Sequence, residues 1–422
     1  MGKQWFRRTL RGTTAFIAIP LMLGQTGCQS AGESVEGPGV DMQAKILYVG
    51  VLNDESGPAA GMGRPFAQGL RTLAHQINSG ESDLLPPGWR VRLVERDHGY
   101  DPQRAVQQFE QTHHDVLFYL SVLGTPSVMA LRPSLEEHDI IAFPASGSSL
   151  MAEHEHTPPS GASYRAEAMR GMDYLTESGQ TSAQPRVAVI YQRDDYGQDG
   201  RQGWVEAAGR KGIQVVAQAG YRAGQTDFSE IVTTLREAEA EAVLLATLPD
   251  ATARILTTAT GQGYHPVWVG NSAAWSDRLY NSRALPEGAL DNTRFVASGP
   301  FWGEDSSFVS EFTSTFDAYT QGRVPRDNYV LAAYVAAQVP FEAFRRALAR
   351  GDTSRAGYRR ALRSISDFNM DGVMPEPLDY TRLPYQPTTL TRVLQPDPAN
   401  RSFAVVGDYA RPESLTGLHA AR

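Results

Sequence analysis

The segment ILYVGVL, residues 46–52, is followed by a glycine-bearing loop over 53–63 and by a helical pattern that starts at Pro65. The segment is apolar throughout and has the length of a strand, which is typical of a strand covered on both faces in a parallel sheet. Proline suits the first position of a helix, because the N–H that it lacks has no partner there. The apolar residues of the predicted helix share one face: Phe66, Leu70, Leu73, Ala74 and Ile77.

This order of strand, loop and helix recurs along the chain. Further strands are predicted at 90–95, 116–122, 140–143, 186–191, 212–217, 242–248 and 266–270, with helical patterns between them. Such alternation predicts doubly wound parallel sheets, so we assign the fold class α/β with two Rossmann-like halves in series. In open sheets of this kind, ligands bind at the loops that follow the strands.

The last third of the chain is less regular. A strand is predicted at 294–297, a long apolar helix over 328–350 interrupted at Pro340, and a closing hairpin at 388–394 and 402–406. Residues 153–162 are predicted to form a surface insertion. Its His154-Glu155-His156 offers two metal-ligand side chains without a defined third one nearby, so no metal site is predicted.

The N-terminus has the pattern of a secretory signal. Four positive charges precede the apolar run 15–23, which is too short to span a bilayer. The single cysteine, Cys28, follows this run where a lipoprotein signal peptidase would cut. We therefore expect removal of residues 1–27, lipidation of Cys28 and a flexible tether over 28–43. An ordinary cleaved signal, with an incidental cysteine, remains the alternative.

Charge and motifs exclude several classes of function. The formal net charge is -8, and loss of residues 1–27 would make the chain more acidic, which argues against a nucleic-acid partner. Gly61-Met62-Gly63 lacks the third glycine of a dinucleotide fingerprint, because Phe66 stands there. We find no phosphate loop, nucleophile elbow or zinc-protease motif, so we expect no enzyme, no catalytic residues and no cofactor.

Small hydroxyl residues gather in the loops at predicted strand ends: Ser56, Thr125, Ser146 and Ser148. Hydroxyl and free N–H groups at helix starts are good receptors for a carboxylate. Each of these residues could instead be only a helix cap. The second half adds the loops 193–198 and 247–250, and Tyr196 in the first of these could cover an apolar ligand face and still offer a hydroxyl.

Five short motifs occur together in a familiar order: Ser56-Gly57-Pro58, Asp101-Pro102, Pro144-Ala145-Ser146, Asp195-Tyr196-Gly197 and Thr226-Asp227-Phe228-Ser229. From about residue 46 to about 409 the chain resembles the type I periplasmic binding proteins, in particular the branched-chain amino-acid branch, which are solute receptors of ABC transporters. The resemblance implies two lobes joined by a three-crossover hinge that closes on a small ligand. It places 44–150 and about 276–345 in lobe 1, and about 163–275 and 346–410 in lobe 2.

The resemblance also implies a monomer in the periplasm or cell envelope, with an inner-membrane ABC permease as partner and membrane contact only through the lipid anchor. The alternative is a regulatory or structural envelope lipoprotein that contacts an enzyme or a sensor. The ligand-binding residues expected from position are Ser56, Met62, Thr125, Ala145, Ser146, Ser148, Tyr196, Thr247, Asp250 and Ser272.

One departure from the family bears on the ligand. Relatives that bind amino acids present an acid after the strand that ends at Gly270, and this acid holds the α-ammonium group. Here residues 271–274 read NSAA and carry no acid. We therefore predict a small polar or carboxylate-bearing solute, which could be another amino acid or a derivative of one but is not a plain branched-chain amino acid. Asp194 or Asp250 could substitute for the missing acid.

Overall fold

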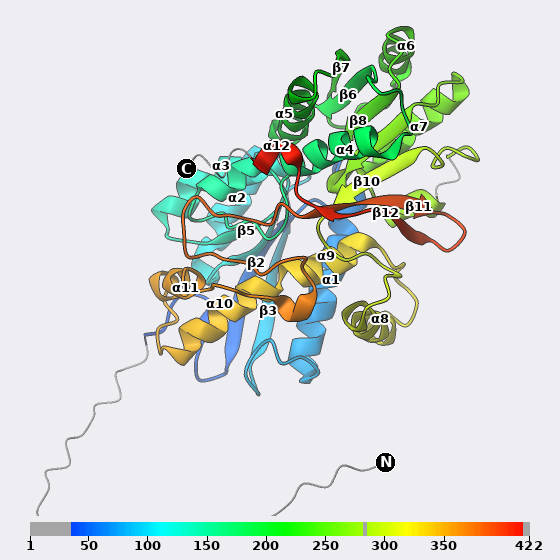
Figure 1. Cartoon of the computed structure of the whole chain (residues 1–422). Helices are drawn as coiled ribbons and strands as arrows, with labels where there is room; N and C mark the ends of the chain where they lie inside the picture. Colours follow the sequence, from blue (N-terminus) through cyan, green and yellow to red (C-terminus); the bar gives the residue numbers. More distant parts are fainter. Residues whose placement is uncertain (1–34, 282–284, 417–422) are drawn as a thin grey trace, which may run out of the picture. The chain divides into compact units, whose positions relative to one another are not determined.

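The computed structural model describes residues 35–281 and 285–416 (Figure 1). The predicted signal segment and Cys28 lie outside the described residues, so cleavage and lipidation remain predictions. No helix among the described residues is both long and apolar enough to cross a membrane.

The first sheet has five strands: β1 (Val40–Asp41), β2 (Ile46–Asn53), β3 (Arg90–Asp97), β4 (Tyr119–Leu123) and β5 (Ala142–Ala145). Strand β2 pairs in parallel with both β3 and β4, and β4 pairs in parallel with β5. Three helices connect these strands: α1 (Ala60–Ser79), α2 (Pro102–Thr112) and α3 (Thr125–Glu137). The alternation predicted for the first half is confirmed.

The second sheet has seven strands in the order β12-β11-β10-β9-β8-β6-β7. Strands β6 to β10 are parallel, and the closing hairpin β11–β12 pairs antiparallel with β10. The strands are β6 (Val187–Gln192), β7 (Val215–Tyr221), β8 (Ala242–Ala246), β9 (Val267–Asn271), β10 (Thr293–Ala297), β11 (Thr391–Asp397) and β12 (Ser402–Ala410). The connecting helices are α4 (Tyr164–Ser178), α5 (Asp195–Arg210), α6 (Ser229–Glu237) and α7 (Pro249–Gly261).

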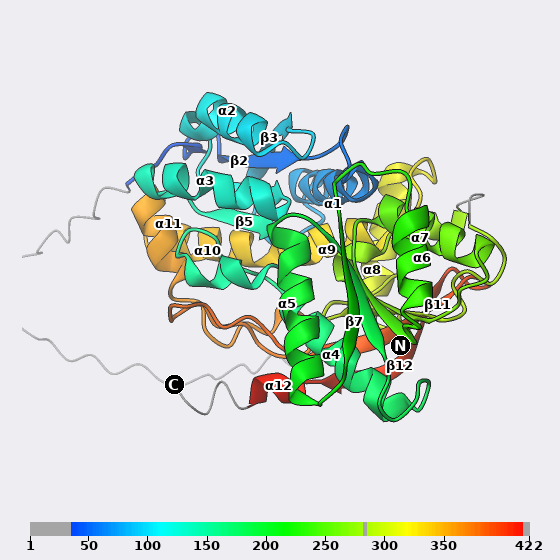
Figure 2. The same cartoon turned by 90° about the horizontal axis from the view of Figure 1, so that it is seen from above.

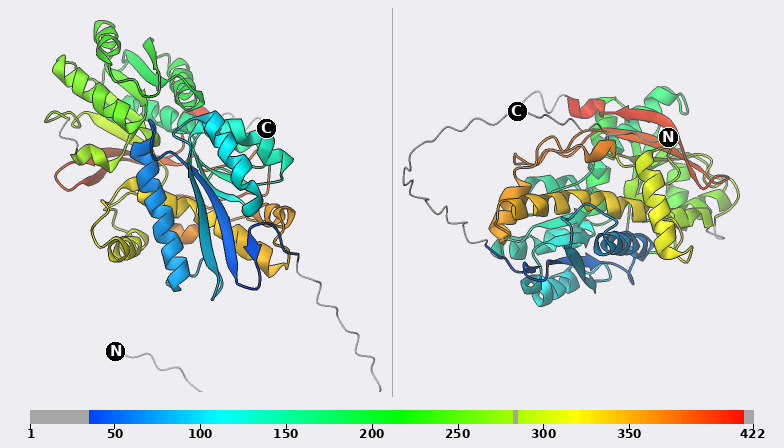
Figure 3. Two further views of the ribbon diagram at one scale, coloured as in Figure 1. Left: turned by 180° about the vertical axis from the view of Figure 1, so that it is seen from behind. Right: turned by 90° about the horizontal axis from the view of Figure 1, so that it is seen from below.

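The remaining helices are α8 (Ser307–Thr320), α9 (Asn328–Ala336), α10 (Gln338–Ala349), α11 (Arg355–Leu362) and the short α12 (Glu413–Thr416). Side chains of α10 and α11, such as Phe344 and Tyr358, belong to the same core as Val49 of β2. Figure 2 shows α10 and α11 beside β5, and Figure 3 shows β11 and β12 with the other strands of the second sheet. The chain therefore passes between the two lobes three times, as the resemblance implied.

The predicted lobe boundaries are wrong in two places. Strand β10 lies in the second sheet, although 276–345 was expected in lobe 1. Helix α11 packs in the core of the first lobe, although 346–410 was expected in lobe 2. The apolar patterns of these segments indicate burial, but they do not indicate which sheet provides it, because both lobes offer similar parallel sheets.

Residues 35–43 are not a flexible tether. Val40 and Asp41 form an antiparallel ladder with the start of β2, and Val35 bridges to Asp352. Gly39 has a positive φ of 76°, and a side chain there would collide with the backbone of Leu117. Gly39 therefore permits a close approach of the backbone to the first sheet.

The predicted surface insertion 153–162 is also corrected. Residues 156–159 are buried, and Thr157 donates from its hydroxyl to the carbonyl of Met151 at 3.0 Å. This stretch is part of the first crossover between the lobes. The carbonyl of His156 accepts from the N–H of Ala142 in the first lobe, and the N–H of Ala162 donates to the hydroxyl of Ser298, which follows β10. His156 contacts Asp139 through Nε2 at 3.2 Å, which gives it an ordinary structural partner.

Two helix boundaries near prolines differ from the prediction. Helix α1 begins at Ala60 and contains Pro65, so the carbonyl of Gly61 loses its helical donor. The hydroxyl of Ser276 faces that carbonyl at 3.5 Å. The long helix predicted over 328–350 breaks at Ala337, and Pro340 lies in the first turn of α10, where its missing N–H does no harm.

Candidate functional site

A cavity of about 180 Å³ lies between the two lobes. The first lobe contributes Met62, Ala145 and Ser146 to its wall, and the second lobe contributes Tyr164 and Ser272. The first crossover closes one side with residues 160–162, and α9 closes another with Tyr329, Ala332 and Ala336. Four of the sequence-predicted ligand residues thus line one cavity: Met62, Ala145, Ser146 and Ser272.

The polar end of this cavity lies at the start of α3. The hydroxyls of Thr125 and Ser146 are 2.6 Å apart, and Thr125 stands behind Ser146, outside the cavity wall. The N-cap of α3 is Gly124, with a φ of 92° and no capping side chain, so Thr125 is the first residue of the helix and not its cap. An uncapped helix start beside two hydroxyls provides donors for an anionic group.

Tyr196 packs where the two lobes meet. It belongs to an apolar cluster that joins Met62 and Leu123 of the first lobe to Tyr164 and Leu248 of the second. Its ring meets Tyr164 edge to face at a centroid distance of 4.8 Å. Its hydroxyl donates to the carbonyl oxygen of Thr247 at 2.7 Å and contacts the side-chain oxygen of Asn271 at 2.9 Å. The protein therefore already occupies this hydroxyl, and Tyr196 is not among the residues that line the cavity; its ring packs against Tyr164, which does line it.

The structure places the other predicted residues outside this cavity. Ser56 is exposed, and its backbone N–H donates to Asp54. Ser148 caps the short 3-10 helix Ser149–Glu153. Thr247 is fully buried and shares a hydrogen bond of 2.7 Å with the hydroxyl of Thr252. These three residues therefore form hydrogen bonds within their own loops or helix starts, and none of them faces the cavity.

Asp250 does not approach the cavity either. It is exposed and lines a separate pocket of about 330 Å³, together with Gly61 and Arg278. Asp194, the other candidate for the missing acid, caps α5 and accepts a hydrogen bond from Gly197 at 3.1 Å. Neither aspartate is placed to face a ligand beside Ser272.

Glu167 of α4 is the acidic residue that the sequence analysis missed. It is 2% exposed, and its Oε2 accepts hydrogen bonds from the N–H of Ser272 at 2.9 Å and from its hydroxyl at 3.1 Å. Burial raises the pKa of the Glu167 carboxyl to about 8, although the hydrogen bonds from Ser272 act in the opposite direction. The loop 271–274 carries no acid of its own, but the tertiary structure brings one to it.

No clear sequence signal could have revealed Glu167. Helix α4 buries nearly every residue from Tyr164 to Leu175, including the polar Arg170 and Asp173. A helix that is buried on all sides lacks the alternation of polar and apolar faces that would mark Glu167 as an acid on the buried side. Only the contact with Ser272, 105 positions away, identifies its place.

A second cavity of about 140 Å³ adjoins the first and shares Ser272, Tyr329 and Ala332 with it. Most of its remaining wall is apolar: Trp275, Phe295, Phe301, Leu394 and Phe403. Trp275 packs edge-on against both Phe295 and Phe403, which gives this cavity rigid aromatic walls. The site thus has a polar end at Ser146 and an apolar end at Trp275.

One group of possible metal ligands occurs in the described part of the chain. Glu110 of α2, His113 directly after α2 and His138 directly after α3 offer atoms within 4.8 Å of one another. The two imidazoles stack face to face, with centroids 4.1 Å apart and an interplanar angle of 22°. Stacked rings direct their lone pairs alongside each other rather than toward one shared ion, so this arrangement does not fit a metal centre.

Comparison with known proteins agrees with this architecture. A family model described as periplasmic binding protein matches residues 47–397. A Leu/Ile/Val-binding protein homolog from Brucella melitensis is 26% identical over 322 residues, which cover 75% of this chain and 79% of that protein. An amino acid binding protein from Pseudomonas aeruginosa is 22% identical and covers 71% of this chain and 78% of its own length.

Two solved structures share the fold. The substrate-binding protein of a fatty acid ABC transporter from Thermomonospora curvata superposes with a TM-score of 0.83 at 23% identity, covering 90% of this chain and 96% of that one. A branched-chain amino acid ABC transporter protein from Thermus thermophilus with bound valine gives a TM-score of 0.77 at 18% identity, covering 91% and 100%. The chain therefore belongs to the periplasmic binding protein family, with the two-lobed α/β fold of its type I members.

Proposed function

We propose that this protein is the extracytoplasmic receptor of an ABC transporter and that it binds a carboxylate-bearing solute with an apolar body between its lobes. The observation that carries the proposal is Ser146, which lines the cavity and whose hydroxyl is 2.6 Å from that of Thr125 at the uncapped start of α3. Helix N-termini attract negative charge, and hydroxyls supply further donors to a carboxylate.

The size and lining of the two adjoining cavities support an apolar body. Each alone is smaller than a typical ligand pocket of about 300 to 1,000 Å³, and the pair reaches the lower end of that range. A ligand whose carboxylate lies at Ser146 could extend its apolar part past Tyr329 toward Trp275. The relatives are named for amino acids and for a fatty acid, and both kinds of molecule combine a carboxylate with an apolar part.

Glu167 bears on the choice between a plain carboxylate and an amino acid. A carboxyl with a pKa of about 8 is mostly neutral at pH 7, so it does not repel a ligand carboxylate. An ammonium group beside it would instead favour the ionised form and would pair with it. We favour the plain carboxylate, because a neutral Glu167 leaves the donors at Ser146 as the dominant polar feature of the cavity.

Leucine and 4-methylpentanoate form a matched test pair, since they share a carbon skeleton and differ in the amine. We expect calorimetric titration at pH 7 to show tighter binding of 4-methylpentanoate. Its affinity should fall as the pH rises through 8, because an ionised Glu167 repels the carboxylate, and Glu167→Gln should remove this pH dependence.

Ser146→Ala should weaken the binding of 4-methylpentanoate by about 1 to 3 kcal/mol. The matched control is Ser314→Ala, which removes an exposed hydroxyl on α8 and should change the binding free energy by less than about 0.5 kcal/mol.

Two outcomes would contradict the proposal in different ways. Tighter binding of leucine, lost in Glu167→Gln, would mean that Glu167 holds an ammonium group and that the protein is an amino-acid receptor. Native mass spectrometry without any retained ligand, together with no binding of either probe or of octanoate, would favour the regulatory or structural lipoprotein. The apolar side chains around Tyr196 would then fill the space between the lobes and leave no room for a ligand.

A further inference from the structure

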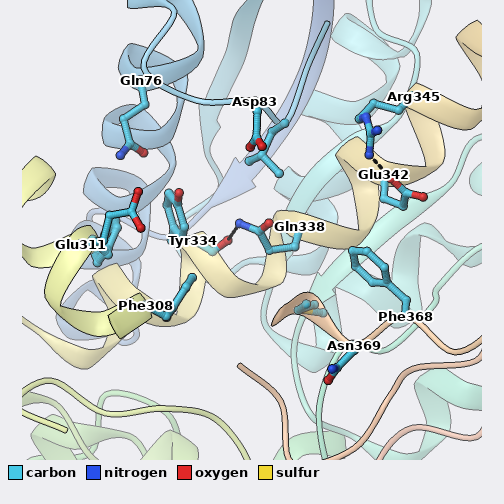
Figure 4. A pocket seen from close by; sticks show the side chains of 13 residues that line it. Gln76, Asp83, Phe308, Glu311, Tyr334, Gln338, Glu342, Arg345, Phe368 and Asn369 are labelled. Atoms are coloured by element: carbon cyan, nitrogen blue, oxygen red, sulfur yellow. Dashed lines mark hydrogen bonds and ion pairs between the residues drawn. The ribbon is translucent and has the colours of Figure 1, made fainter. Parts of the chain in front are cut away.

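A larger pocket, of about 480 Å³, lies on the flank of the first lobe and outside the cleft (Figure 4). We call it the flank pocket. Its lining comes from α1, the loop after α1, α8, α9, α10 and residues 368–370. The hydrophobic clusters of the first lobe hold these elements together, so the pocket does not depend on how the lobes close.

The acidic side chains of the flank pocket differ in their partners. Asp83 and Glu311 of the lining are both exposed, and their carboxylates have no ion pair or hydrogen bond among the described residues. Glu342 of the same lining pairs with Arg345 and with Arg346, each at 2.6 Å. Figure 4 shows Gln76, Glu311 and Tyr334 toward one side and the Glu342–Arg345 pair toward the other. The lining therefore carries two negative charges that no cation among the described residues neutralises.

Gln76 gives an independent sign of a missing partner. Its side chain lines the pocket and is 5% exposed, and its amide oxygen has no hydrogen-bond partner in the described part of the chain. A buried acceptor without a donor is costly and rare in folded proteins. A ligand that brings N–H donors into this end of the pocket would satisfy it.

The aromatic lining favours a cation. Tyr334, Phe308 and Phe368 face the pocket. The pKa of the Tyr334 phenol is raised to about 12, chiefly by burial and then by the charges of Glu311 and Asp83. The negative potential of both carboxylates thus reaches the ring of Tyr334. Aromatic faces attract ammonium groups, and the attraction grows when the ring is partly desolvated.

We propose that the flank pocket is a second ligand site, which binds a small organic amine in its ammonium form. Glu311, Asp83 and the amide oxygen of Gln76 receive the ammonium group, and the apolar body packs on Phe308 and Tyr334. The volume is within the range of small-molecule sites. This site is separate from the cleft and does not rest on the identity of the solute bound there.

Phenethylamine and 2-phenylethanol test the proposal, because they share a ring and a chain and differ in charge. We expect calorimetry on the whole mature protein to detect phenethylamine and to find 2-phenylethanol at least about tenfold weaker. The double variant Asp83→Asn with Glu311→Gln should weaken phenethylamine binding about tenfold. The matched control is Asp317→Asn. Asp317 lies on α8, as Glu311 does, but its carboxylate pairs with Arg326 at 2.5 Å and is not part of the pocket lining. This control should leave the affinity within about twofold.

A second arm separates the flank pocket from the cleft. Ser146→Ala should leave phenethylamine binding unchanged, whereas loss of binding in this variant would place the amine in the cleft and overturn the proposal. Equal affinity in the double variant and in the unmodified protein would also overturn it, as would the absence of any phenethylamine binding at millimolar concentration.

Discussion

The loops that follow the first parallel strand of each lobe invite comparison. Asp54 follows β2 and is fully buried, and its carboxylate accepts the N–H groups of Ser56 and Ala59 at 3.1 and 2.7 Å and that of Gly57. Asp194 follows β6 and accepts from the N–H of Gly197 in its own loop. It also accepts the hydroxyl proton of Tyr100, which belongs to the other lobe, at 3.1 Å.

The two aspartates have different roles at equivalent positions. All the backbone donors of Asp54 lie in its own loop, so that loop is formed within the first lobe alone. Asp194 completes its set of donors only when the lobes are together. Both loops need a glycine for close approach, since a side chain at Gly63 would meet the carbonyl of Asp54 and one at Gly197 would meet that of Gln192. One loop is held within its own lobe, and the other is also tied to the opposite lobe through Tyr100.

Asp54→Ala should have the largest effect, because it leaves three backbone N–H groups without their acceptor, a carboxylate that is fully buried. We expect a loss on the order of 3 kcal/mol or more in the free energy of unfolding, measured by urea denaturation. Asp101→Ala is the matched control, since this exposed aspartate also accepts two N–H groups, at the start of α2. Its loss should be about 1 kcal/mol. Equal losses in the two variants would show that Asp54 is only an ordinary turn cap.

Tyr100→Phe should have an intermediate effect, confined to lobe closure. The variant removes the hydrogen bond to Asp194 and the contact of 3.2 Å with Nε2 of Gln192. The closed state should lose about 0.5 to 1.5 kcal/mol, which lowers the closed-to-open ratio by up to about tenfold. Energy transfer between labels on the two lobes would measure this ratio, with Tyr319→Phe, an exposed tyrosine on α8, as control. An unchanged ratio would mean that Tyr100 packs against the second lobe without holding it.

Ser56→Ala should have the smallest effect, although Ser56 was among the ligand residues expected from the sequence. Its side chain is exposed, and its hydroxyl approaches Asp97 rather than the cavity. We expect changes below about 0.5 kcal/mol in both the unfolding free energy and the affinity for 4-methylpentanoate. A tenfold loss of affinity would place the ligand against the loop after β2 and would move the site away from Ser146.

The sequence by itself determined the alternation of strands and helices, the fold class and the family. These features follow from local patterns, because a buried parallel strand such as 46–52 must be apolar on both faces, whichever sheet it joins. The sequence also marked Ser146 and Ser272, which line the cavity, since strand-end loops meet at one edge of each sheet.

The tertiary structure alone decided which groups meet across long distances in the chain. It turned Ser56 outward, placed β10 in the second sheet and α11 in the first lobe, and brought Glu167 to the loop at Ser272. None of these has a local signature, because helical and strand periodicity report that a residue is buried and not what buries it. The polarity of the cleft, and with it the class of ligand, depends on such contacts between distant segments.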